Sequence, residues 1–243
     1  MEPTSFRPAP NQLVWISHFV GQKFRGDAVP RDPDRVARFF DRGPAGDIDV
    51  PGFLDPSMPA GFLKSADLGL HWIGYESNTT AVDLDPPTFA RYVEEEGLDR
   101  VAAERKAQGL EDKGVHELFS RCAKLAVDVG GKGPHTGIDK PLGLTLEIVP
   151  GADLLSLQPN HPLPVTILFR GKPFAGALVT ARERSQPEPR LESRTDAKGR
   201  ATLHLDRPGV WLLKVTQMEH AAPETGADWR SYWGSLTFEM PGG

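Results

Sequence analysis

The 243-residue sequence predicts a mainly β protein made of two β-sandwich-like domains, the first elaborated with two or three α-helices. Three observations carry this prediction. Apolar and polar residues alternate along most of residues 163–217, which is the period of a half-buried strand. Glycine (25 residues) and proline (23 residues) are abundant, as expected where many short strands are joined by turns. Sustained helical spacing is confined to residues 86–129.

The N-terminal part is predicted to form several strands before any long helix. Residues 12–20 (QLVWISHFV) are typical of a buried strand, and further strands are expected at 68–76 and 80–84. A short helix is expected at 33–40. Residues 41–66 are rich in Gly, Pro and Asp and are expected to be irregular.

Three helices are predicted next, at residues 86–96, 98–108 and 113–129. Asp85 can cap the first of them. Two prolines follow it, at the positions where a helix tolerates proline best. The third helix has the clearest amphipathic pattern in the chain. The residues with helical spacing there are Val115, Leu118, Phe119, Cys122, Leu125, Ala126 and Val129.

From Leu163 onward the whole chain is predicted to be β. The loop at 151–162 is the expected domain boundary. Residues 1–155 would form a β domain with a helical insertion at about 86–129, and residues 156–243 a transthyretin-like or Ig-like β-sandwich. Besides the alternating strands around 165–169 and 177–181, strands are expected at 200–206, 209–217 and 233–240.

Composition narrows the class of protein. The net charge is −5 and the basic residues are scattered, which argues against nucleic acid as a partner. The one cysteine, Cys122, excludes an internal disulfide framework. No apolar run is long enough to span a bilayer. The start, MEPTSFRPAP, lacks a signal-peptide pattern, so the protein is either cytoplasmic or has lost a signal peptide already.

No catalytic set can be assembled from the sequence, so we expect a protein that is not an enzyme. The segment HELFS at 116–120 begins like a zinc-protease helix, but Ser120 stands where the second histidine is needed. Glu117 and Arg121 then fit a structural ion pair between residues four apart, which Lys124 extends.

Histidines supply the sharpest functional hypothesis. His18 and His71 lie on predicted strands, and with a carboxylate such as Glu147 they could hold a nickel, cobalt, copper or zinc ion. Their spacing does not require a site. The alternative is that both are hydrogen-bonded strand histidines.

An aromatic cluster precedes the last predicted strand. Trp229, Tyr232 and Trp233 could form a platform that contacts a ligand or a partner. Packing between the two domains explains the cluster equally well.

Seven segments, taken as an ordered series, give the chain a family resemblance. It resembles the bacterial DUF4198 family, formerly described as periplasmic components of nickel or cobalt uptake systems. The resemblance implies a transthyretin-like or carboxypeptidase-regulatory-like sandwich in the C-terminal half, and export to the periplasm or cell envelope. The matching segments are EEEGLDRV, ELFSRCAKLAV, PLGLTLEIVP, LFRGKPFAGALV, TDAKGRATLHL, GVWLLKV and ADWRSYWGSLTF.

Two departures from the family pattern weaken a metal site. Family members begin with a histidine-containing H-[DE]-F-W-x-E-P segment after the signal peptide, whereas here Met1 directly precedes Glu2 and Pro3. Relatives also carry histidine in a strand where this chain has Gln217.

The leading interpretation is a non-enzymatic periplasmic protein that binds a ligand, with a transition metal as the candidate, for an uptake system and with envelope transport components as partners. The second interpretation is a cell-envelope interaction module that binds a protein or glycan without a metal. We expect neither nucleic acid as a partner nor a membrane span.

Overall fold

The computed structural model of the chain describes residues 1–242, apart from the side chain of Gln22. Within these residues the chain forms seventeen β-strands and two α-helices, which confirms the predicted mainly β fold. None of the described helices is both long and apolar enough to cross a membrane.

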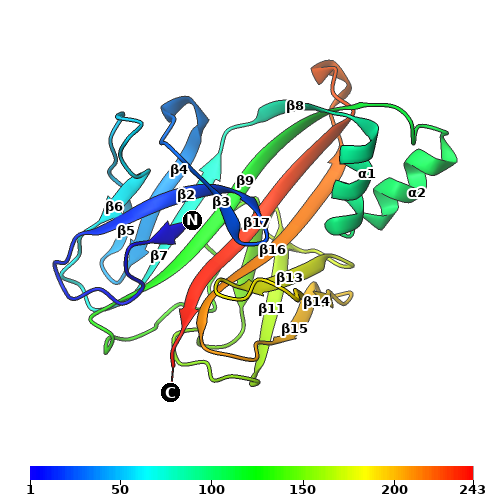
Figure 1. Cartoon of the computed structure of the whole chain (residues 1–243). Coiled ribbons are helices and arrows are strands. Elements are labelled where there is room, and N and C mark those ends of the chain that lie inside the picture. The colour runs from blue at the N-terminus through cyan, green and yellow to red at the C-terminus, as the bar shows by residue number, and fades with distance from the viewer. Residues whose placement is uncertain (243) are drawn as a thin grey trace.

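One central sheet of nine strands runs through the molecule. Its long neighbouring strands β9, β17 and β16 lie side by side in the middle of Figure 1. Neighbours are antiparallel except β17 and β9, which are parallel. In spatial order the strands are β14 (Leu191–Arg194), β13 (Leu178–Glu183), β16 (Gly209–His220), β17 (Trp229–Met240), β9 (Val115–Val129), β7 (Gly69–Ser77), β4 (Val36–Gly43) and β5 (Gly46–Asp49), while β8 (Thr80–Leu84) also pairs with β9.

Two smaller sheets and two helices cover the central sheet. One small sheet contains β1 (Glu2–Pro3), β2 (Val14–Gln22), β3 (Arg25–Val29) and β6 (Gly61–Leu63). The other contains β10 (Leu146–Pro150), β11 (Pro162–Phe169), β12 (Lys172–Pro173) and β15 (Arg200–His204). The helices are α1 (Pro86–Glu95) and α2 (Asp99–Ala107), which lie beside each other at one end of the long strands (Figure 1).

The side chains of β9 show how these layers are arranged. Leu125 and Val127 pack with Val14 of β2, so one face of the central sheet is covered by the N-terminal sheet. We call this side the N-terminal face. Cys122 and Ala126 pack with the β10–β11 sheet on the opposite side, which we call the sandwich face. The helices cover the far end of the N-terminal face, because Phe89 and Val93 pack against residues of β9, β16 and β17.

The predicted helix at 113–129 is wrong, since these residues form strand β9. Both faces of this strand are buried, so apolar residues occur at odd and even positions alike. Such a pattern contains helical spacing by coincidence, and periodicity cannot separate a doubly buried strand from a buried helix. Its 15 residues also exceed the usual length of a strand. The helical insertion therefore ends with α2.

The structure corrects the organisation of the N-terminal part as well. The short helix expected at 33–40 is a 3-10 turn, Pro33–Arg35, that leads into β4. The expected boundary at 151–162 falls between β10 and β11, which are hydrogen-bonded neighbours. Strands from both sides of residue 155 share the central sheet. The division into two domains stays a prediction.

The predicted ion pair of Glu117, Arg121 and Lys124 is also wrong, because a strand places these side chains differently from a helix. Glu117 and Arg121 point toward the N-terminal face, and Lys124 points toward the sandwich face. There the Lys124 ammonium group bonds Glu147 of β10 at 2.9 Å and lies 4.4 Å from the Trp72 ring centroid.

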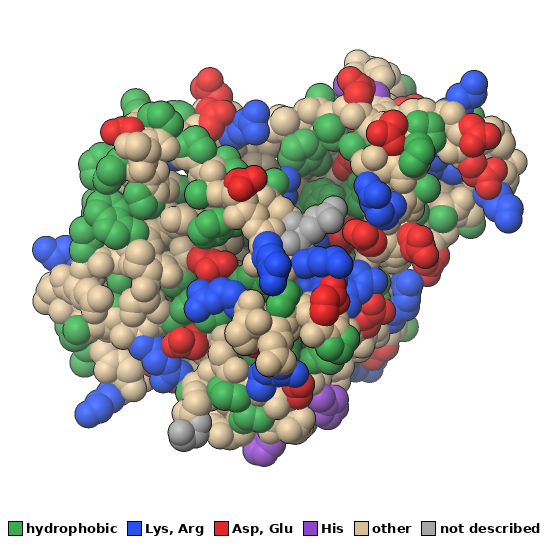
Figure 2. Space-filling view, in the orientation of Figure 1, with side chains coloured by type: hydrophobic (Ala, Val, Ile, Leu, Met, Phe, Trp, Pro, Cys, Tyr) green, Lys and Arg blue, Asp and Glu red, His purple; other side chains and the backbone are tan. Residues whose placement is uncertain are grey.

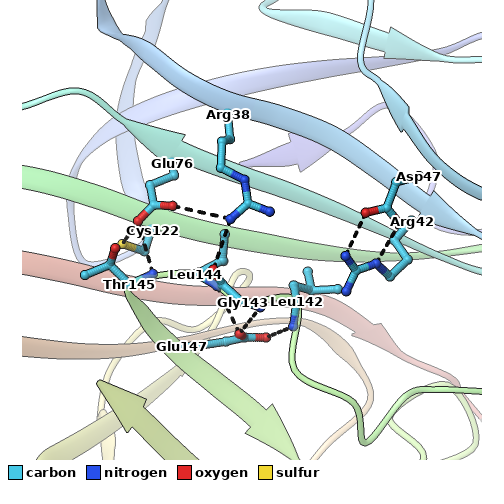
Figure 3. Close-up of polar contacts among 10 residues, drawn as sticks. All are labelled: Arg38, Arg42, Asp47, Glu76, Cys122, Leu142, Gly143, Leu144, Thr145 and Glu147. Atoms are coloured by element: carbon cyan, nitrogen blue, oxygen red, sulfur yellow. Dashed lines mark hydrogen bonds and ion pairs between the residues drawn. The ribbon is translucent and has the colours of Figure 1, made fainter. Parts of the chain in front are cut away.

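Glu147 fastens the loop before β10 to the sheet. Its buried carboxylate accepts hydrogen bonds from the backbone N–H groups of Leu142, Gly143 and Leu144, at 2.7, 3.0 and 3.2 Å (Figure 3). With Lys124, the carboxylate thus receives four donors, which compensates for the loss of water.

Glu76 of β7 also holds the loop before β10. It accepts a hydrogen bond from the Thr145 N–H at 3.1 Å (Figure 3). The Cys122 thiol lies 3.7 Å from the same carboxylate oxygen, and burial raises the pKa of Cys122 to about 12, so the thiol keeps its proton. The loop is therefore held to two strands of the central sheet.

Lys124→Met is expected to destabilise the protein by about 3–5 kcal/mol, because it leaves the Glu147 carboxylate buried without its counter-ion. Urea unfolding measures the free energy of unfolding. The control is Arg42→Met, which breaks the solvent-exposed pair with Asp47 and should cost about 1 kcal/mol or less. Equal losses in the two variants would contradict this account of the Lys124–Glu147 pair.

Candidate functional site

A cavity with a volume of about 1210 Å³ lies on the N-terminal face. Its floor is formed by β7, β9, β16 and β17, and its walls come from the β2–β3 hairpin and α1. Figure 2 shows a hollow between these two walls with Lys and Arg side chains beside it. The N-terminal sheet and the helices cover opposite ends of the same face and leave this space between them. The volume is ample for a small-molecule ligand.

The lining of this cavity is basic although the chain is acidic. Nine Lys or Arg residues line it, against four Asp or Glu residues. The whole chain carries a net charge of −5. A cleft lined mainly by one sign of charge attracts ligands of the opposite sign.

Arg121 lies on the cavity floor without a counter-ion. Its guanidinium carbon is 5.3 Å from the Phe119 ring centroid and 6.0 Å from that of Trp233. Among the described side chains and backbone groups, none pairs with or accepts a hydrogen bond from this guanidinium. Burial lowers the pKa of Arg121, although arginine stays protonated at neutral pH. The desolvated charge is uncompensated in the free protein.

Most other cations of the cavity already have partners within the chain. Lys214 bonds Glu96 at 2.9 Å. Arg182 bonds Glu188 at 2.8 Å. Arg31 donates to the carbonyl groups of Val50 and Ala60, both at 3.2 Å. These groups hold the walls together, which leaves Arg121 as the half-buried cation with donors to spare.

The aromatic wall beside Arg121 is held by a buried carboxylate. Tyr92 of α1 stacks on Trp233 of β17, with ring centroids 4.9 Å apart and planes at 20°. The Tyr92 hydroxyl donates to Glu117 at 3.2 Å, and the Ser231 hydroxyl donates to the same carboxylate. Burial raises the pKa of Glu117. Glu117 thus positions α1 against the sheet rather than pairing with Arg121.

The three predicted metal ligands do not come together. Glu147 lies on the sandwich face, bonded to Lys124. His71 lies on the N-terminal face, where its Nδ1 is 2.8 Å from Asp41 and its Nε2 is 3.1 Å from the Asp67 carbonyl oxygen. Because both ring nitrogens are occupied, His71 has no atom free for a metal.

His18 has a different environment from His71. Its ring lies 4.3 Å from that of Tyr75, and burial lowers its pKa to about 3, which keeps the imidazole neutral. Its Nε2 is buried without a partner in the described part of the chain. Within residues 1–242, no three His, Cys, Asp or Glu side chains form a metal-binding group. The residues present therefore do not fit the expected nickel, cobalt, copper or zinc ion.

The predicted aromatic platform is divided between core and cavity. Trp229 is buried under the helices, where it stacks on His220 at 4.3 Å. Tyr232 is buried on the sandwich face. Trp233 alone of the three lines the cavity.

A separate apolar patch is exposed on the outer side of the N-terminal sheet. Trp15, Phe53 and Phe62 contact one another, with ring centroids 5.8–6.1 Å apart. Beside them in sequence, Leu54 is 76% exposed. Figure 2 shows hydrophobic side chains gathered over this part of the molecule. We call these four residues the apolar patch.

Fold and cavity together define a β-sandwich protein with a basic, aromatic-lined cavity. The chain belongs to the family described as "Domain of unknown function (DUF4198)", whose model matches residues 1–219. No curated protein matches the sequence. Among solved structures, the chain is similar to the "D0-D1 domain of Intimin", with 12% identity, a TM-score of 0.22, and coverage of 97% of this chain and 95% of that one.

Arg121→Met is expected to raise the free energy of unfolding of the free protein by about 1 kcal/mol, because it removes a desolvated charge that has no partner. The matched control is Arg182→Met, which breaks an ion pair in the same cavity and brings no gain. Urea unfolding of both variants measures the difference. A loss of stability in the Arg121 variant would show that the guanidinium has a structural partner.

The free energy of unfolding is expected to fall as pH rises through the folded-state pKa of His71. Burial alone would lower that pKa, but hydrogen bonds and charge from Asp41, helped by Asp67, outweigh it, and the pKa is raised. The stabilisation is therefore full below the unfolded-state value of about 6.5 and is lost above the folded-state value.

Imidazole NMR titration and urea unfolding between about pH 6 and 9 check this expectation. Asp41→Asn should lower the pKa of His71 and flatten the pH dependence. A His71 pKa at or below the unfolded-state value would contradict it.

Proposed function

We propose that the protein is a non-enzymatic binding protein of the bacterial cell envelope that holds a small-molecule ligand in the cavity on the N-terminal face. The observation that carries this proposal is the uncompensated Arg121 charge on the floor of a cavity of about 1210 Å³. A desolvated cation costs stability in the free protein, and a bound ligand of opposite charge would recover that cost. The location in the cell envelope is the one that the family resemblance implies.

The cavity also has the construction expected of a ligand site. Its wall residues are held in place by contacts among themselves, such as Tyr92 with Trp233 and Lys214 with Glu96. Its lining combines apolar and aromatic side chains with polar and charged groups. Pre-formed walls lower the entropy lost on binding. Because His71, His18 and Glu147 do not come together, these residues do not support a metal ion as the ligand.

The second candidate function is the interaction module, which would contact another protein or a glycan. The apolar patch favours it, since Leu54 and Phe53 expose large apolar side chains. The cluster of Trp229, Tyr232 and Trp233 does not favour the interaction module, because Trp229 and Tyr232 are buried.

The fluorescent dye 1-anilinonaphthalene-8-sulfonate distinguishes the two candidates, because it is an aromatic anion that suits the cavity and is attracted to any apolar patch. Ser235 lines the cavity, so Ser235→Trp should fill part of it and abolish dye binding. The control variant, Phe53→Ser with Leu54→Ser, should bind the dye like the wild type.

Circular dichroism and urea unfolding establish that both variants are folded. If dye binding is instead lost in the apolar-patch variant and kept in the Ser235 variant, the proposed ligand cavity is overturned and the interaction module is favoured.

A further inference from the structure

The cavity shows which chemical class of ligand it would take, an inference that rests on the proposed function. The hydrogen-bond donors of the cavity indicate the chemical class of the ligand. The Arg121 guanidinium presents a planar fork of N–H groups that matches the two oxygens of a carboxylate. The described residues offer it no acceptor, whereas its own backbone N–H is occupied by Ser77 at 2.9 Å.

The count of free charges in the cavity limits the charge of the ligand. Lys214, Arg182 and Arg190 are each paired with a glutamate. Arg25 and Arg91 line the rim, where both are exposed to solvent. Exposed charges are screened and contribute little binding energy. Lys23 and Arg35 are paired with carboxylates, and Arg31 donates to two backbone carbonyl groups. Burial lowers the pKa of the Met1 amino group, which also lines the cavity, to about 6, so this group is mostly neutral at pH 7. Arg121 is therefore the half-buried cation of the lining to which the described residues offer no acceptor, and this suits one negative charge better than the two of a phosphate group.

The surroundings of Arg121 define the rest of the ligand. Phe119, Tyr75 and Trp233 supply aromatic surface within the same cavity. Burial raises the pKa of Tyr75, so this side chain stays neutral and adds no negative charge. An apolar body next to the carboxylate would bury its surface on these rings.

We propose that the cavity binds a monocarboxylate with an apolar, ring-containing body, whose carboxylate is held by the Arg121 guanidinium between Phe119 and Trp233. The carboxylate supplies the counter-ion that Arg121 lacks. The rings of Phe119 and Trp233 exclude water from the resulting ion pair, which strengthens it.

The test compares 1-naphthaleneacetate with its neutral isostere 1-naphthaleneacetamide by isothermal titration calorimetry. The two compounds share the ring and differ in the charged group. The acid is expected to bind about 10–100-fold more tightly than the amide, the usual range for one charge-assisted interaction. Arg121→Met should abolish this preference, whereas the control Arg42→Met, outside the cavity, should keep it.

The outcomes separate the ligand class from the proposed function. If acid and amide bind equally and Ser235→Trp abolishes both, the cavity stands as a ligand site and the carboxylate assignment is overturned. Competition by inorganic phosphate as strong as that of the acid would also overturn it. If neither compound binds, and the aromatic dye does not bind either, the proposed function itself falls.

Discussion

The pairing of β9 with β17 on one side and with β7 and β8 on the other is the constraint on which the rest of the structure depends. It joins strands from both halves of the chain into one sheet. Because successive side chains of a strand point to opposite faces, β9 gives one set of residues to each face. Lys124 on the sandwich face ties down the loop before β10, and Arg121 on the N-terminal face lies in the cavity. Stability and the proposed binding are thus carried by opposite faces of one strand.

Much of the fold could be predicted from sequence because several strands, such as β11 and β15, are buried on one face and keep a clear alternation. The alternation at 163–169 and around Trp211 corresponds to β11 and β16, whose inward residues fill the sandwich core. The strand at 80–84 and the first two helices were predicted within a residue or two. The prediction failed at β9, where burial on both faces removes the alternation from which a strand is recognised.

The candidate site could not be predicted because it depends on that same strand. A helix over 113–129 would place Glu117 and Arg121 as neighbours, which made Arg121 a paired structural residue. In a strand Glu117 bonds Tyr92 and Ser231 instead, and Arg121 remains unpaired. The histidines drew attention because imidazole is a common metal ligand, yet pairing with Asp41 and Asp67 occupies His71 fully. A long stretch that is apolar at both odd and even positions, with single charges inside it, is the sequence signal that could have found the site.

The account depends most on Arg121, whose counter-ion is expected to be an anionic ligand from outside the chain. A crystal structure of the protein soaked with 1-naphthaleneacetate tests this claim most directly. The account predicts density for the carboxylate within hydrogen-bond distance of the Arg121 guanidinium, with the ring lying against Phe119. A guanidinium bonded to a carboxylate of the protein itself, with the compound absent from the cavity or bound elsewhere, would contradict it.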